Sequence, residues 1–332
     1  MKKSKKWYII AGIVVVLALV VALWGRALFM YAFINILLKC DSEEECKKAY
    51  ARFLQNKSVY ESTEDVTPWT YKAIQSEETG IWHRYFYLPS KQQNTNTIVM
   101  LHGFNTDARS FLNFHPLSER YNLVSYFLPE SSPYYKGSFS DFIPILNDLL
   151  SNLGLDSAIF VGSSMGGAIA SHYASLQKEK KVEALILVAS TNFGAVKKDM
   201  KRIQRMRKLL LKHEDYRLYN MMVKGEDILT LFREKKQNRN HLVKKNIDWY
   251  RQILNSLDKY GGIPGERDND FPVLAVHGEN DRLLPSSSLQ EYERAFQNIT
   301  YQIIPNGGHT IWVSKPNKVI EYVEQFLKKH DI

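Results

Sequence analysis

A serine flanked by glycines carries the clearest chemical signal in the chain. Ser164 lies in the spacing Gly162-x-Ser164-x-Gly166, after a short apolar run and before a segment of helical composition. A serine at a sharp strand-to-helix bend adopts a strained backbone, so the positions two residues away on either side must lack bulk. The first N–H groups of the following helix would point to the place where an oxyanion forms. The pattern therefore predicts a nucleophilic serine at a bend.

A serine hydroxyl is a weak nucleophile, and it needs a histidine base that is oriented by a carboxylate. Both residue types occur downstream. Asp281 follows the apolar stretch 273–277, and His309 follows the stretch 301–304. Each lies in a loop after a predicted strand, and the order along the chain is serine, acid, histidine. We therefore expect Asp281 and His309 to complete a triad with Ser164.

Other acids and histidines compete for these two roles. Glu279 lies two residues before Asp281, and further acids follow the apolar stretch 184–189, so the orienting acid has alternatives. His102 lies in a His-Gly pair, and we interpret it as structural rather than as a proton carrier. The other histidines that we interpret as structural or surface residues are His83, His172, His213 and His241.

Short apolar segments alternate along the chain with segments of helical periodicity. Continuous apolar strands separated by helices indicate a mostly parallel sheet that is covered on both faces. The expected strands are residues 82–88, 97–102, 123–127, 157–161, 184–189, 273–277 and 301–304, and the expected helices include residues 142–153, 168–174 and 318–329. The predicted fold class is α/β.

Four motifs together make residues 82–327 resemble the α/β-hydrolase superfamily, of the serine lipase/esterase type. The motifs are Leu101-His102-Gly103-Phe104, Gly162-Ser163-Ser164-Met165-Gly166-Gly167, Gly278-Glu279-Asn280-Asp281 with Pro285, and Gly307-Gly308-His309. The resemblance implies an α/β-hydrolase fold, with Ser164 as nucleophile, His309 as base and Asp281 as orienting acid.

The resemblance also implies an oxyanion hole formed by the backbone N–H groups of Phe104 and Met165. It implies no metal and no organic cofactor. The chain departs from the family in one loop. Many relatives carry an aspartate and a glycine-rich turn after the strand before the elbow, whereas residues 128–133 read Leu-Pro-Glu-Ser-Ser-Pro. Because this loop shapes the mouth of the pocket, the departure weakens inferences about substrate.

The first residues of the chain have the composition of a membrane anchor. A basic segment, residues 1–6, precedes an uninterrupted apolar run at residues 7–24. As a helix this run would be roughly 27 Å long, close to the thickness of a bilayer's hydrocarbon core. Trp7 and Trp24 lie at its ends, where interfacial aromatic residues belong.

We expect an uncleaved, single-pass signal anchor with a cytoplasmic N-terminus, which places the catalytic domain on the outer, periplasmic or extracellular, side. The alternatives are a cleaved and secreted protein, or a cytoplasmic catalytic domain.

The remaining chain divides into a lead-in, a core and an inserted cap. Residues 25–71 form a juxtamembrane and lead-in segment, and residues 72–190 and 271–332 form the predicted core. Residues 191–270 read as a basic helical cap, in a chain whose formal net charge is +9. Its charge has two interpretations, a solvated outer face or a surface for an anionic partner such as lipid headgroups or an acidic protein. We expect no nucleic-acid partner, because no nucleic-acid motif is present and the lysines accompany an anchor.

These features predict a membrane-anchored serine hydrolase that cleaves carboxylic esters through an acyl-enzyme on Ser164. The expected substrate is a small-molecule or lipid ester with an apolar acyl group. The alternatives are a thioesterase, a peptidase or an acyl-carrier-protein methyl esterase on the same scaffold, or a hydrolase-fold binding protein without catalysis. Cys40 and Cys46, the two cysteines of the chain, form a short-loop disulfide or remain free thiols.

Overall fold

The computed structural model describes residues 68–93, 95–104, 106–129, 138–176, 181–190, 256, 260–263, 269–281, 283–284 and 286–332. The predicted anchor at 7–24, both cysteines and almost all of the predicted cap at 191–270 lie outside these residues. Within the described ranges, no helix is both long enough and apolar enough to cross a membrane.

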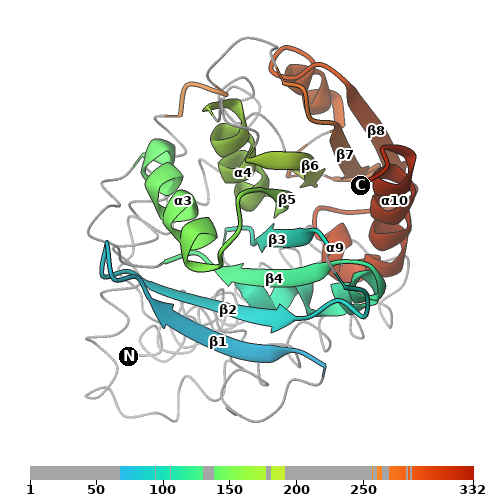
Figure 1. Ribbon diagram of the computed structural model, residues 1–332. Coiled ribbons are helices and arrows are strands. Elements are labelled where there is room, and N and C mark those ends of the chain that lie inside the picture. The colour runs from blue at the N-terminus through green and yellow to red at the C-terminus, as the bar shows by residue number, and fades with distance from the viewer. Residues whose placement is uncertain are drawn as a thin grey trace, which may run out of the picture.

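In the described part of the chain, eight strands form one sheet in the order β1-β2-β4-β3-β5-β6-β7-β8 (Figure 1). The strands β1 and β2 pair antiparallel, as do β2 and β4, and the other neighbours are parallel. The prediction of a mostly parallel sheet flanked by helices is confirmed. The strands are β1 (Thr70–Gln75), β2 (Trp82–Leu88), β3 (Thr97–Leu101), β4 (Asn122–Phe127), β5 (Ala158–Ser163), β6 (Val182–Val188), β7 (Val273–Gly278) and β8 (Ile299–Ile304).

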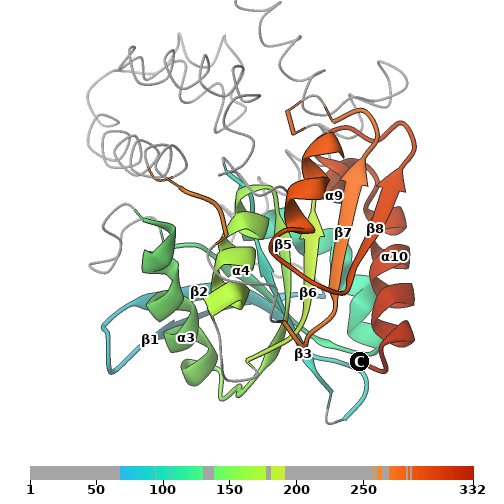
Figure 2. The ribbon, with the colours of Figure 1, turned by 90° about the horizontal axis from the view of Figure 1, so that it is seen from above.

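Helices cover both faces of the sheet (Figure 2). One layer holds α3 (Phe142–Asn152) and α4 (Met165–Leu176), and the other holds the 3₁₀ helix η1 (Ala108–Glu119) with α9 (Ile311–Ser314) and α10 (Pro316–Lys329). Successive strand residues alternate between the two layers, so Phe160 packs in the first and Ile159 in the second. Every residue of β5 is buried, as its position in the centre of a parallel sheet requires.

Strand β1 and the 3₁₀ helix η1 were not predicted from the sequence, nor were the short helices η2 (Phe139–Asp141), η4 (Ser286–Tyr292) and α9. Strand β1 begins at Thr70, two residues before the predicted start of the core, and nearly all of its side chains are exposed. It therefore lacks the apolar alternation that indicates a strand, and its pairing with β2 fixes it instead. The 3₁₀ helix η1 contains Pro116, and a mid-element proline is not a helix signal.

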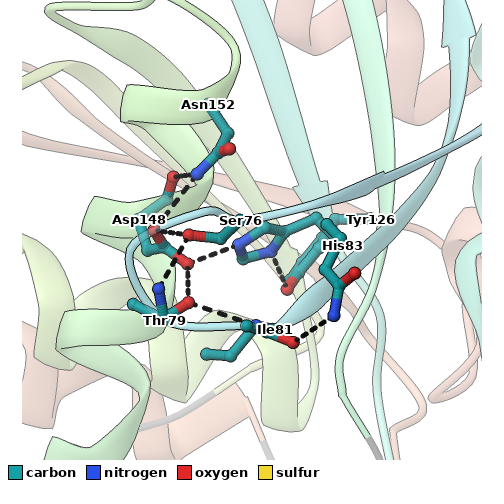
Figure 3. Close-up of polar contacts among 9 residues, drawn as sticks. Ser76, Thr79, Ile81, His83, Tyr126, Asp148 and Asn152 are labelled. Carbon is teal, nitrogen blue, oxygen red and sulfur yellow. Dashed lines mark hydrogen bonds and ion pairs between the residues drawn. The ribbon is translucent and has the colours of Figure 1, made fainter.

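A buried polar cluster joins the β1–β2 turn to α3 (Figure 3). The Asp148 carboxylate accepts hydrogen bonds from Ser76 Oγ at 2.7 Å, Thr79 Oγ1 at 2.6 Å and His83 Nε2 at 2.8 Å. The other ring nitrogen of His83 lies 2.8 Å from the Tyr126 hydroxyl. Burial alone would raise the pKa of Asp148, but the bonds from Thr79, His83 and Ser76 outweigh it and hold the pKa below its ordinary value.

The Asp148→Ala variant should lose about 3 kcal/mol of unfolding free energy, because three donors, two of them fully buried, lose their acceptor. A depressed pKa stabilises the fold above the unfolded value, so this difference should shrink as the pH falls below about 4. Urea unfolding at neutral and acid pH measures both effects. Asp156→Ala, at an exposed position, is the control. Equal losses in the two variants at neutral pH would contradict the prediction.

Candidate active site

The loop after β5 bends sharply at Ser164, whose φ of 48° lies in the left-handed region. A Cβ added at Gly162 would lie 2.5 Å from the backbone of Gly166 and Gly167, and one at Gly166 would collide with the carbonyl of Leu101. Backbone therefore passes so close to the bend that only glycine fits at these two positions. The spacing read from the sequence has this steric cause.

The hydroxyl of a second serine, Ser190, forms a hydrogen bond with the backbone at the bend. Ser190, which follows β6, donates a hydrogen bond to the Ser164 carbonyl at 2.7 Å, and the Tyr292 hydroxyl donates to Ser190 Oγ at 3.0 Å. Both side chains are buried. Neither residue is predicted from the sequence: the position of Ser190 after a predicted strand is the only signal, and Tyr292 carries none.

The structure brings Ser164, His309 and Asp281 together. His309 Nε2 lies 3.0 Å from Ser164 Oγ, and His309 Nδ1 lies 2.8 Å from Asp281 Oδ2. The three residues are 8%, 3% and 5% exposed, respectively. An ionised carboxylate only accepts, so Nδ1 carries the proton and Nε2 accepts from the serine hydroxyl. This arrangement can remove a proton from Ser164.

The Asp281 carboxylate is held in its ionised form. Its Oδ1 accepts from the backbone N–H groups of Leu283 and Leu284, each at 2.8 Å. Burial acts to raise the pKa of Asp281, but the attraction of His309 and the hydrogen bonds from His277 and His309 hold it well below the ordinary value. The acid therefore stays charged at neutral pH.

The loops that carry Asp281 and His309 are joined to each other through backbone. Asn280 N–H donates to the Gly307 carbonyl at 2.8 Å. A Cβ at Gly278 would collide with the Gly308 carbonyl, so glycine allows the two loops to meet.

Glu279, the alternative acid, is exposed and accepts from Asn306 N–H at 2.9 Å. Asp281, and not Glu279, is the acid that contacts His309. The acids after the stretch 184–189 lie outside the described residues.

The two residues predicted for the oxyanion hole, Phe104 and Met165, belong to backbone segments next to the serine. Met165 is the first residue of α4, where N–H groups have no acceptor within the helix. Phe104 follows Gly103, and a Cβ added at Gly103 would lie 3.2 Å from Ser164 Cβ. The Gly103–Phe104 backbone therefore runs beside the serine.

His102 fixes this part of the backbone. Its Nδ1 lies 2.9 Å from the Gly103 carbonyl, and its Nε2 accepts from Leu128 N–H at 3.2 Å. Burial lowers the pKa of His102, which keeps the ring neutral. Both nitrogens are engaged with backbone, in agreement with a structural role.

Two of the other histidines, His83 and His172, form hydrogen bonds with side chains outside the triad. His83 belongs to the Asp148 cluster, and His172 is buried on α4 with Nε2 3.0 Å from Ser140 Oγ. His213 and His241 lie outside the described residues. In the described ranges, no group of three or more His, Cys, Asp or Glu side chains is arranged to hold a metal ion.

A further histidine near the triad, His277, is not predicted from the sequence and is buried near the end of β7. Its Nε2 lies 2.6 Å from the Leu284 carbonyl and 3.3 Å from Asp281 Oδ2. Because His277 ends an apolar run, the sequence pattern indicates only a strand residue. Its spacing of four residues from Asp281 was the available signal.

Known proteins similar to this chain include hydrolases from a bacterium and from a vertebrate. The uncharacterized hydrolase YugF of Bacillus subtilis is 21% identical over 272 residues, which cover 75% of this chain and 94% of YugF. The monoacylglycerol lipase abhd6-A of Xenopus laevis is 23% identical over 262 residues, which cover 71% of this chain and 77% of the lipase.

Solved structures show the same fold. A bacterial membrane phospholipase A, described as a virulence factor, superposes with a TM-score of 0.57 at 18% identity, covering 92% of this chain and 97% of that one. The family model for the alpha/beta hydrolase fold matches residues 96–316, which is more than half of the chain and includes the elbow and both downstream loops. The chain belongs to the alpha/beta hydrolase fold family.

Proposed function

We propose that this hydrolase cleaves carboxylic esters through an acyl-enzyme formed on Ser164. One observation carries the proposal: a continuous run of hydrogen bonds from Ser164 Oγ through His309 to Asp281 Oδ2, with distances of 3.0 and 2.8 Å. A serine, a histidine and an ionised carboxylate in this order form an activated nucleophile.

In the proposed reaction, Ser164 Oγ attacks the ester carbonyl while His309 Nε2 takes the hydroxyl proton. Asp281 holds the imidazole with Nδ1 protonated and stabilises the imidazolium that forms. The proton then passes from His309 to the departing alkoxide, and the acyl group remains on Ser164. Water, deprotonated by His309, attacks the acyl-enzyme and releases the carboxylic acid, and the proton returns to Ser164 Oγ.

The negative charge of each tetrahedral intermediate needs hydrogen-bond donors. We assign this role to the backbone N–H groups of Phe104 and Met165. The assignment is supported by the first-turn position of Met165 in α4 and by the closeness of the Gly103–Phe104 backbone to the serine. Donors on a rigid backbone lose little energy to reorganisation when the charge develops.

The proposed substrate is a small-molecule or lipid ester with an apolar acyl group. The names of the relatives support this class, since one acts on monoacylglycerol and one structural neighbour is a phospholipase. The fold alone does not fix the substrate. We also propose that residues 7–24 anchor the enzyme with its catalytic domain outside the cytoplasm, which rests on the length and flanks of that apolar run. For the basic segment 191–270, a solvated outer face and a surface for an anionic partner both remain predictions.

A fluorophosphonate probe should label the full-length protein at Ser164, because the probe reacts with a serine that is activated by a base. A membrane-impermeant form should label spheroplasts before lysis if the domain lies outside. Peptide mapping locates the label, and a panel of p-nitrophenyl esters and matching thioesters then ranks the acyl and leaving groups. Absence of labelling in the folded protein would favour the non-catalytic alternative. Labelling only after lysis would place the domain in the cytoplasm.

A further inference from the structure

His277 directs a single N–H group toward both the triad acid and the turn that follows it. Its side chain is fully buried, with Nε2 2.6 Å from the Leu284 carbonyl and 3.3 Å from Asp281 Oδ2. A carbonyl oxygen only accepts, so Nε2 carries a proton. Nδ1 is buried without a hydrogen-bond partner among the described residues. The polar contacts of this ring among the described residues are thus all made by one N–H.

Leu284 is held through both its backbone N–H and its backbone carbonyl. Leu284 N–H donates to Asp281 Oδ1 at 2.8 Å, and the Leu284 carbonyl accepts from His277. Leu283 N–H also donates to Asp281 Oδ1 at 2.8 Å. With Oδ1 held by the turn, Oδ2 is the oxygen that faces both His309 and His277. The orientation of the carboxylate therefore depends on where Leu284 is held.

We propose that His277 is a positioning residue for the triad: its Nε2–H attaches Leu284 to β7 and so keeps Asp281 Oδ2 directed at His309. This proposal rests on the proposed hydrolase function. His277 acts through Asp281, touches neither Ser164 nor the reacting atoms, and transfers no proton. A misplacement of about 1 Å in a catalytic group costs up to roughly 10²-fold in rate, which sets the expected size of the effect.

The same N–H has an electrostatic consequence that a purely structural contact would lack. It draws on the negative charge at Asp281 Oδ2, so without it the carboxylate would hold a proton on His309 more tightly. The base would then be freed only at higher pH. In the described part of the chain, Asp281 faces His309 and His277, while His309 faces Asp281, Ser164 and, edge-on at 5.7 Å, Trp312. Asp281 is the charged group in this set.

The test uses three variants of His277 in the full chain. His277→Gln places an amide N–H near the position of Nε2, His277→Asn ends one bond short of it, and His277→Leu removes the donor. We expect the Leu and Asn variants to lose roughly 10- to 100-fold in kcat with little change in KM. The acid limb of their kcat/KM profile should move to higher pH. The Gln variant should recover most of kcat and the original profile.

Asp148→Ala is the stability control, because it removes buried hydrogen bonds without touching the elbow or the loops after β7 and β8. It should lower the unfolding free energy while keeping kcat and the pH profile. If the Leu variant fails to fold, the comparison of Asn with Gln decides. Wild-type kcat in the Leu and Asn variants, or a folded Gln variant as slow as Asn, would overturn the role of His277. A wild-type protein that hydrolyses no ester and takes no fluorophosphonate label would instead overturn the proposed function.

Discussion

The Ser164→Ala variant should lose ester hydrolysis by a factor on the order of 10⁶ in kcat, the loss typical when a triad nucleophile is removed. The reason is direct, since Oγ is the atom that His309 Nε2 contacts at 3.0 Å and the atom proposed to carry the acyl group. The Cβ remains, so the bend keeps its shape, and the unfolding free energy should change by less than about 1 kcal/mol. Hydrolysis of a p-nitrophenyl ester and urea unfolding measure the two effects.

Ser163→Ala is the matched control for this experiment. Ser163 is the preceding residue and is also buried, but its hydroxyl has no hydrogen-bond partner among the described residues. The Ser163→Ala variant should therefore keep its activity and its fluorophosphonate labelling. Turnover that survives in Ser164→Ala, or a loss of the same size in Ser163→Ala, would remove Ser164 from the proposed role.

The sequence predicted the strands of the sheet well because buried parallel strands are continuous apolar runs. It predicted residues 82–88 with the observed ends of β2. It ended the elbow strand at residue 161, whereas β5 continues to Ser163. Glycine and serine have weak strand preference, and pairing with Leu187 and Val188 of β6 extends the strand over them. Here tertiary pairing overrides local preference.

The three side chains of the triad were predictable because each follows a strand of a parallel sheet. Parallel strands deliver their following loops to one edge, so the order of motifs along the chain identified which residues would meet. The supporting groups were not predictable in this way. Ser190 and Tyr292 are far apart in the sequence and meet behind the bend, and no local pattern marks such a contact.

The short distances from an added Cβ to neighbouring backbone explain why glycine occupies these positions in the motifs. Gly162 and Gly166 are required by backbone packed against the bend, and Gly278 by the contact between the acid and histidine loops. The sequence could show the spacing of these glycines but not which backbone each one faces. They make three separate loops approach closely enough for the side chains of the triad to form hydrogen bonds.

The Asp281→Asn variant should lose about 10³- to 10⁴-fold in kcat while it remains folded. The asparagine Oδ1 can still accept from Leu283 and Leu284 N–H, so the turn is kept. Its amide NH₂, however, would face His309 Nδ1 and donate to it. The proton of His309 then moves to Nε2, which can no longer accept from Ser164. The structure therefore predicts a kinetic loss caused by the wrong tautomer, measured as kcat at fixed pH, with urea unfolding as the check that the variant is folded.

Glu279→Gln separates this effect from a general loss of negative charge in the loop. Glu279 lies two residues away, is exposed, and accepts from Asn306 N–H, a contact that a glutamine oxygen can keep. This variant should retain kcat close to that of the wild type. If instead Glu279→Gln were the slow variant and Asp281→Asn the fast one, the orienting acid would be Glu279. Because Asp281 is ionised well below neutral pH and contacts His309 directly, the geometry and the charge both require the opposite result.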